Sequence, residues 1–280
     1  MKALFDKISL KASVMVTNAY STSFSLGIRM LNESVREPVY AIYGFVRFAD
    51  EIVDSFEGYD KAALIADFRK QTDAAIAQKI SLNPILNSFQ HAVNHHKIDQ
   101  WLIDAFFDSM EMDLEDQTYD QETFEKYILG SAQVVGLMCL RIFCNGDSTQ
   151  YESLKEGAMS LGSAFQKVNF LRDLKADKDD LGRIYFPGMN IQEWTPQLKK
   201  EIEADIAIDF KHALEAINRL PSNSKYGVYT AYRYYFKLFR KLENASFEEL
   251  FTKRLRVPNT TKFRLLFTSK ARLAMGTYFL

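Results

Sequence analysis

Apolar residues recur with the period of an α-helix along almost the whole chain, and this regularity constrains the fold more than any other feature. Only 12 Gly and 6 Pro interrupt the pattern in 280 residues, and no alternation of apolar and polar residues is long enough for a sheet. We therefore predict an all-α fold in which helices pack on helices. The expected helices cover about 4–19, 38–56, 60–79, 84–97, 99–116, 121–144, 150–178, 196–219, 223–243, 246–254 and 260–276, with Pro38 at the first position of the second helix.

The composition is typical of a globular protein, with 47% hydrophobic and 14% aromatic residues. We find no internal repeat and no linker, so we predict a single domain over residues 1–280. The formal net charge of −1 gives no reason to expect a nucleic-acid partner. The oligomeric state cannot be predicted from these features.

Neither a signal peptide nor a transmembrane helix is expected. The first residues, MKALFDKISLK, contain charges and no long apolar run. The longest apolar stretch, 134–144, is interrupted by Arg141 and is shorter than the roughly 18 residues that a membrane span needs. Cys139 and Cys144 lie five residues apart in a predicted helix and cannot bridge there. We therefore expect a cytoplasmic protein.

A polar stripe crosses the predicted helix 150–178. Its members, Gln166, Asn169, Asp173 and Asp177, lie at spacings of three, four and four residues, so they share one helical face. Largely apolar neighbours indicate that this face is partly buried. Two carboxylates one turn apart repel each other unless a cation lies between them, and oxygen ligands of this kind suit Mg²⁺.

A second acidic pair with the same spacing, Asp50 and Asp54, lies in the predicted helix 38–56. A single pair of this kind usually belongs to a solvated helix face, but two pairs inside apolar helices favour a metal site. The acidic residues of 104–115 are better explained as a solvated face. His91 and His95, one turn apart, have no further ligand partner in the sequence and are expected at the surface rather than around zinc.

These motifs resemble those of the squalene/phytoene synthase family, which joins prenyl diphosphates head to head, and the chain is most similar to a bacterial phytoene synthase. The matching stretches are STSFSLGIRML (21–31), VYAIYGFVRFADEIVD (39–54), MEMDLED (110–116), YILGSAQVVGLM (127–138), QKVNFLRDLKAD (166–177) and GRIYFP (182–187). The middle motif departs from the family pattern at Ile128, Leu129 and Gln133, and Ala176 replaces an acidic residue before Asp177. The resemblance implies a helical bundle of the isoprenoid synthase type with a central apolar cavity.

The resemblance also implies a reaction. We expect a prenyl transferase that condenses two geranylgeranyl diphosphates to phytoene through a cyclopropyl (prephytoene) diphosphate, for carotenoid synthesis, with Mg²⁺ or Mn²⁺ and without NADPH. One alternative is a squalene or dehydrosqualene synthase that uses two farnesyl diphosphates. Another, from a different class, is a non-catalytic relative that acts as an assembly or binding protein. A head-to-tail prenyl transferase or terpene cyclase is a weaker alternative, because those enzymes usually carry an Asp-Asp-x-x-Asp motif.

By the same resemblance, we expect catalytic and metal-binding roles for the four aspartates of the two pairs. The residues expected to bind metal are Asp50, Asp54, Asn169, Asp173 and Asp177. The residues expected to bind the diphosphates are Ser21, Ser23, Tyr43, Arg47, Tyr127, Gln166, Asn169, Arg172, Tyr185, Tyr235 and Arg254. For Tyr235, the neighbouring Tyr232 is a competing candidate.

The C-terminal segment is basic. From Phe251 to Leu280 there are seven Lys or Arg and no Asp or Glu, with large apolar residues between them. This composition suits peripheral contact with an anionic membrane surface, such as the inner face of the cell membrane. A basic helix packed on an acidic surface of the same protein is the alternative.

Overall fold

The structure, a computed structural model, describes residues 1–115, 119–181, 185–187 and 195–275, without the side chains of Ser23, residues 176–181 and Phe247. The described part consists of helices and connecting segments and contains no strand, so the all-α prediction is confirmed. The helices are α1 (Lys2–Tyr20), α2 (Thr22–Arg29), α3 (Glu33–Ser55), α4 (Lys61–Gln78), α5 (Pro84–His96), α6 (Gln100–Met112), α7 (Gln121–Ile128), the π-helical turn η1 (Leu129–Gln133), α8 (Val134–Cys144), α9 (Ser148–Leu181), α10 (Pro196–Ile217), α11 (Ser222–Glu243), α12 (Phe247–Thr252) and α13 (Asn259–Ala274).

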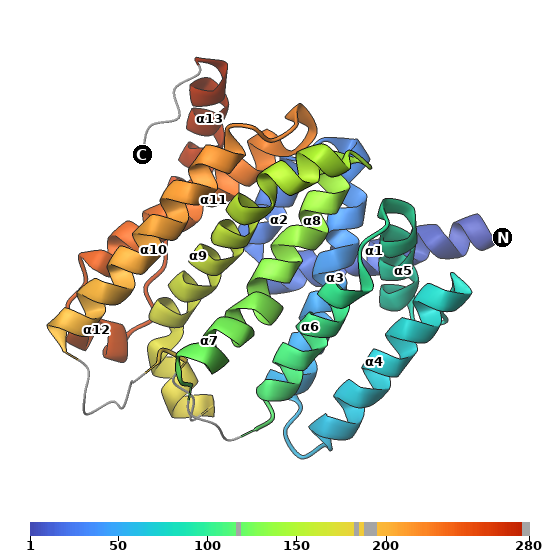
Figure 1. Cartoon of the computed structure of the whole chain (residues 1–280), viewed down its shortest axis with the longest axis horizontal. Coiled ribbons are helices and arrows are strands. Elements are labelled where there is room, and N and C mark those ends of the chain that lie inside the picture. The colour runs from blue at the N-terminus through green and yellow to red at the C-terminus, as the bar shows by residue number, and fades with distance from the viewer. Residues whose placement is uncertain (116–118, 182–184, 188–194, 276–280) are drawn as a thin grey trace.

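The helices form two layers, and the long helix α9 belongs to one of them. In one layer α10, α9, α8, α6 and α4 lie in this order, each packed against the next (Figure 1). Behind them lie α11, α2, α3 and α1, with α1 packed across α3 and α5 (Figure 1). The two helices that carry the aspartate pairs, α3 and α9, therefore both lie next to α8 and enclose the space beside it.

Two predictions about helix boundaries were wrong. Pro38 lies inside α3, which begins at Glu33 because the Asn32 side chain caps it by accepting a hydrogen bond from the Ser34 N–H. The sequence pattern also missed α2. Ser21 caps this short helix by accepting from the Phe24 N–H at 3.1 Å.

The predicted helix 121–144 contains a π-helical turn that its apolar pattern does not reveal. At η1 the hydrogen bonds span five residues instead of four, which inserts one residue into the turn. Gly162 of α9 lies against this turn, and a Cβ atom there would be 2.6 Å from the Ala132 carbonyl oxygen. Close contact between α9 and η1 therefore requires glycine at this position.

One helical stretch, Gln121–Cys144, is long and apolar enough to span a membrane by length and composition, and 56% of its most apolar window is buried in the protein. Core helices of soluble proteins meet the same criteria. The predicted absence of a transmembrane helix and the cytoplasmic location both stay predictions.

Candidate active site

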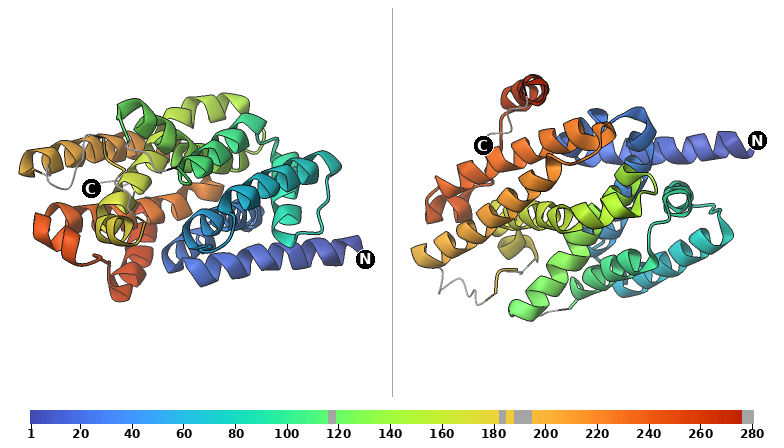
Figure 2. Two further views of the ribbon diagram at one scale, coloured as in Figure 1. Left: turned by 90° about the horizontal axis from the view of Figure 1, so that it is seen from below. Right: turned by 45° about the horizontal axis from the view of Figure 1, so that its top comes forward.

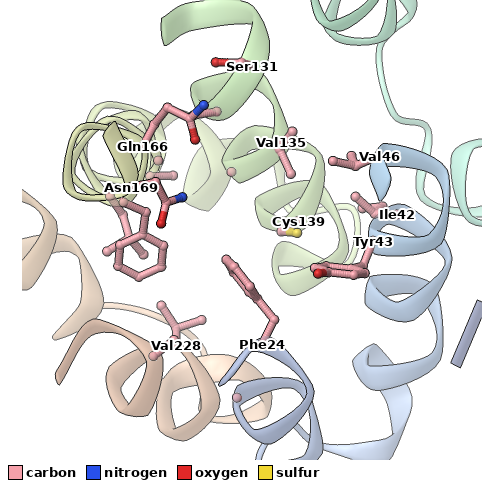
Figure 3. Close-up of a pocket in the computed structure, with 18 of the residues that line it drawn as sticks. Phe24, Ile42, Tyr43, Val46, Ser131, Val135, Cys139, Gln166, Asn169 and Val228 are labelled. Atoms are coloured by element: carbon pink, nitrogen blue, oxygen red, sulfur yellow. The ribbon is translucent and has the colours of Figure 1, made fainter. Parts of the chain in front are cut away.

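A cavity of about 580 Å³ lies between α2, α3, α8, α9 and α11. Figure 3 shows Tyr43 on α3, Cys139 on α8, Asn169 on α9 and Val228 on α11 around one space, with the ring of Phe24 pointing into it. The expectation of a central, largely apolar cavity is confirmed.

The cavity has a polar end and an apolar end. The polar lining comes from the C-terminal halves of α3 and α9 and from nearby segments: Arg47, Asp50, Asp54, Asp113, Tyr127, Gln166, Asn169, Arg172, Asp173, Tyr185 and Arg254. The apolar lining comes from the N-terminal halves of the same helices and from the ends of α8 and α10: Val39, Ile42, Leu140, Phe143, Leu154, Leu161 and Ile217. Because an α-helix rises about 1.5 Å per residue, the lining residues Leu154 and Asp173 of α9 lie roughly 28 Å apart along its axis. The cavity is thus long and amphiphilic.

Asp50 and Asp54 lie at the polar end on one face of α3. Burial, together with repulsion from Asp54, raises the pKa of Asp50 to about 7. Arg47 partly offsets this effect, with its Nη1 atom 3.8 Å from Asp50 Oδ2, and it also pairs with Glu51. The guanidinium of Arg47 lies over the ring of Tyr20, at 4.4 Å from the ring centre. A cation at this end would therefore stabilise the ionised form of Asp50.

Asp173 faces two arginines. Arg172 donates from Nε to Asp173 Oδ1 at 3.0 Å and from Nη2 to Oδ2. Arg254, from the segment after α12, forms an ion pair with Asp173 in which Nε lies 2.7 Å from Oδ1, and it donates a hydrogen bond from Nη2 to Oδ2 at 3.2 Å. The polar end thus holds a concentration of planar cationic groups, which suit the oxygen atoms of phosphates.

Gln166 and Asn169 share one face of α9, as their spacing predicts, and they point into the cavity (Figure 3). Tyr235 does not line the cavity. Its hydroxyl lies 3.4 Å from Asn169 Oδ1, and its ring stacks on Phe165 with centroids 3.9 Å apart. Tyr235 supports the wall, whereas the competing Tyr232 is buried against Phe210.

The remaining predicted residues divide into three groups. Tyr43, Tyr127 and Tyr185 line the cavity. Ser21 does not line it, but caps α2 by accepting a hydrogen bond from the Phe24 N–H. Asp177 belongs to α9 and Ser23 to α2, but their side chains lie outside the described part of the structure.

Asp113 is a site residue that the sequence analysis did not select, although it lies in one of the matching motifs. The residue is 6% exposed, and its carboxylate accepts hydrogen bonds from Tyr127 at 2.8 Å and Tyr185 at 3.1 Å. Burial and the nearby Asp113 charge raise the pKa of Tyr127, so this hydroxyl stays protonated and donates. Tyr185 also stacks on Phe170 with centroids 4.2 Å apart. Through these two hydrogen bonds, Asp113 at the end of α6 connects α7 with the segment after α9 at the polar end of the cavity.

The donor set at the polar end fits a hard divalent cation. Its members are carboxylate and carboxamide oxygens, the ligands that Mg²⁺ prefers, and burial with repulsion from Asp54 raises the pKa of Asp50, an effect that a nearby cation would oppose. Among the residues that the structure describes, no three His, Cys, Asp or Glu side chains cluster closely enough to form a metal site alone. Metal binding by the two aspartate pairs stays a prediction.

Comparisons with known proteins agree with this picture. A family model described as squalene/phytoene synthase matches residues 17–261. The chain is 34% identical to a presqualene diphosphate synthase of Zymomonas mobilis over 188 residues, which are 65% of this chain and 62% of that protein. It is 29% identical to a 4,4'-diapophytoene synthase of Staphylococcus haemolyticus over 66% of this chain and 65% of that protein. It is 25% identical to a phytoene synthase of Arthrospira platensis over 90% of this chain and 89% of that protein.

The fold is similar to that of a solved dehydrosqualene synthase in complex with a ligand. The TM-score is 0.81 at 19% sequence identity, with 96% of this chain and 98% of the other covered. At this identity the similarity concerns the fold.

Proposed function

Because the chain belongs to the squalene/phytoene synthase family, we propose that it joins two identical allylic prenyl diphosphates head to head through a cyclopropyl diphosphate. The observation that carries this proposal is the division of one cavity into an acidic and basic end and a long apolar end. The polar end suits two diphosphate groups, and the apolar end suits two prenyl chains.

Loss of diphosphate from an allylic carbon leaves an allylic cation. Divalent ions, held by Asp50, Asp54, Asn169, Asp173 and Asp177, would supply Lewis-acid assistance to the leaving group. Arg172 and Arg254, which surround Asp173, can transfer hydrogen bonds to diphosphate oxygens when ligand oxygens approach. These residues bind and orient the leaving group.

The apolar lining protects the cation from water. Phe24, Phe165 and Phe170 present rings at the wall, and an aromatic face stabilises a nearby cation by roughly 0.5–2 kcal/mol. Exclusion of water also prevents hydrolysis of the cation to an alcohol.

For the chain length of the substrate, we propose geranylgeranyl diphosphate, with phytoene as the product of a reaction in carotenoid synthesis that does not need NADPH. The similarity to phytoene synthases of Arthrospira platensis and Zea mays supports this proposal, since it extends over 90% of this chain in each case. The apolar length beside α9 also leaves room for a long chain.

The second candidate substrate is farnesyl diphosphate. It is favoured by the higher identities, 34% and 29%, to presqualene diphosphate synthases of Zymomonas mobilis and Rhodopseudomonas palustris. This chain matches 62% and 59% of their lengths, so the similarity does not extend over their whole sequences.

The test is an incubation of the purified protein with Mg²⁺ and each prenyl diphosphate separately, with and without NADPH, followed by mass spectrometry of the products. We expect phytoene from geranylgeranyl diphosphate regardless of NADPH. Preferential turnover of farnesyl diphosphate would favour the second candidate. No product from either substrate would contradict the proposed reaction.

We also propose that the basic segment after Phe251 brings the protein to an anionic membrane at the cytoplasmic side. The support is its composition, with seven Lys or Arg and no acidic residue. A hydrocarbon product would leave directly into lipid from such a position.

A further inference from the structure

The outer face of α1 carries a row of exposed apolar side chains. Leu4, Ile8 and Met15 are 63%, 52% and 68% exposed, although each is large and apolar. Their spacings of four and seven residues place them on one side of the helix. The opposite side, with Ser9 and Ser13, is fully buried. The exposed row is therefore a fixed feature of a firmly packed helix.

The charges beside this row are basic. Lys7 and Lys11 are exposed and lie at the edge of the same face. The single acidic residue of α1, Asp6, points away from the row, since it pairs with Lys2 and accepts a hydrogen bond from Asn87 of α5 at 3.0 Å. The outer face of α1 thus combines bulky apolar groups with positive charge.

The helix α13 has the same arrangement. Phe263 and Phe267, one turn apart, are 58% and 76% exposed, with the exposed Arg264 and Lys270 on either side. The helix contains no Asp or Glu. Its outer face therefore has the same chemistry as that of α1.

The inner face of α13 is attached to the body of the protein. Arg233 of α11 donates to Thr268 Oγ1 at 2.9 Å and Ser269 Oγ at 2.8 Å. Lys262 donates to Thr22 Oγ1 of α2 at 3.1 Å. These bonds fix the orientation in which the phenylalanines point outward.

Both helices lie on the same side of the molecule. In the left view of Figure 2 α1 and α13 both lie along the lower edge, and in the right view both lie towards the top, which is the side away from the viewer in Figure 1.

An interfacial helix inserts apolar side chains below lipid head groups while Lys and Arg meet anionic phosphates. We infer that α1 and α13 together form a surface that docks on an anionic lipid bilayer, with α1 as an anchor equal in importance to the basic C-terminal helix.

A second copy of this chain fits the surface less well. A symmetric dimer would place the same face of each copy against the other, and would bring the lysines of one close to those of the other. Anionic lipid instead complements the charge. The inference extends to α1 the membrane contact proposed above for the basic C-terminal segment. It rests on the proposed reaction only for its purpose, the release of a hydrocarbon product into lipid.

Vesicle sedimentation of the full chain tests the inference. The vesicles contain phosphatidylcholine alone, or with about a third phosphatidylglycerol. We expect binding to the anionic vesicles, little binding to the neutral ones, and release as salt is raised from about 0.05 to 0.5 M. Two double variants remove apolar side chains from the surface: Ile8→Gln with Met15→Gln in α1, and Phe263→Gln with Phe267→Gln in α13. Each should lower the vesicle partition coefficient by about tenfold or more.

The matched control is Tyr59→Gln with Ile208→Gln, which replaces two exposed apolar residues outside both helices and should bind like the wild type. Failure of the wild type to bind anionic vesicles overturns the inference, as does wild-type binding by the α1 variant. Sedimentation equilibrium that detects a dimer dissociated by the α1 variant also overturns it.

Turnover of detergent-dispersed substrate separates this inference from the proposed reaction. The surface variants should keep wild-type turnover in detergent. If the wild type binds vesicles but has no turnover, the proposed reaction is contradicted and the inference about the lipid-binding surface is not.

Discussion

Asp173 lies at the centre of the charges at the polar end, between Arg172 and Arg254. Asn at this position would keep the shape of the side chain but remove its negative charge. That charge pairs with both guanidinium groups, and it is also the charge that would bind a cation. We expect Asp173→Asn to lower kcat by about 100-fold or more, a loss of at least about 2.7 kcal/mol in transition-state stabilisation, with an unchanged circular dichroism spectrum. Asp67→Asn, at an exposed position of α4, is the matched control. Wild-type rates in Asp173→Asn would support a non-catalytic role for the site.

The hydrogen bonds to Asp113 give a second prediction. Asp113→Ala leaves the hydroxyls of Tyr127 and Tyr185 buried without this acceptor, so it should lower the free energy of unfolding by about 1–3 kcal/mol and also reduce kcat. Asp113→Asn keeps one acceptor oxygen and should be milder. In urea titrations the Ala substitution should cost less when both tyrosines are already Phe. An equal cost in both backgrounds would show that these hydrogen bonds do not support the site.

The raised pKa of Asp50 gives a third prediction, which concerns the dependence of stability on pH. Because folding raises this pKa from 3.8 to about 7, the contribution of Asp50 to stability is fully present below about pH 4 and is lost as the pH rises through 7. In metal-free protein the unfolding free energy of the wild type should therefore fall relative to Asp50→Asn over this range. The ceiling is about 4 kcal/mol, and the measured effect should be smaller because the Asp50 side chain is 32% exposed and solvent screens its charge. Urea titrations with a chelator across this pH range measure the difference. A difference independent of pH would contradict the assigned environment.

At the residue scale the sequence predicted what depends on local spacing. Asp50 and Asp54 share a face, as do Gln166, Asn169 and Asp173, because three- and four-residue spacings determine this within one helix. The contact of Asp113 with Tyr185 spans 72 residues and depends on how separate elements meet, so no spacing could predict it. The catalytic, metal-binding and substrate-binding roles of these residues stay predictions. The side chain of Asp177 is not among those that the structure describes.

At the scale of elements, the apolar period predicted most helices but not their irregularities. The π turn adds one residue without changing the apolar character of its stretch, and α2 is too short for the period to be visible. Pro38 misled the prediction because this proline lies inside a helix that has already begun at Glu33, after the Asn32 cap. Caps and packing, rather than periodicity, determine these features.

The contact between α9 and η1 is open to a direct test. In Gly162→Ala the new Cβ would be 2.6 Å from the Ala132 carbonyl oxygen, so the two backbones must separate. We expect a loss of about 1–3 kcal/mol in unfolding free energy, measured by urea titration. Gly27→Ala, also at the cavity wall, would place its Cβ 3.5 Å from Ala231 Cβ, an ordinary contact, and should gain about 0.5–1 kcal/mol from helix propensity. Equal effects of the two substitutions would contradict the close packing at η1.

At the scale of the whole molecule, two helices remote in sequence bring their acidic faces to one end of an apolar cavity. The sequence predicted the helices and the acidic faces, while the cavity and its length result from the packing of α3, α8, α9 and α11. That residues 1–280 act as one domain stays a prediction. The central claim is that this cavity couples two substrates head to head.

The most direct test uses geranylgeranyl diphosphate labelled with carbon-13 at C1, with Mg²⁺ and purified protein, and nuclear magnetic resonance of the product; labelled farnesyl diphosphate is run in parallel. We predict a hydrocarbon in which the two labelled carbons are bonded to each other and show one-bond coupling. If the reaction stops early, one label should lie in a cyclopropane ring and the other on the carbon that bears the diphosphate. From either substrate, a product with one label on the diphosphate-bearing carbon and the other in an open-chain methylene would reveal head-to-tail coupling and contradict the claim.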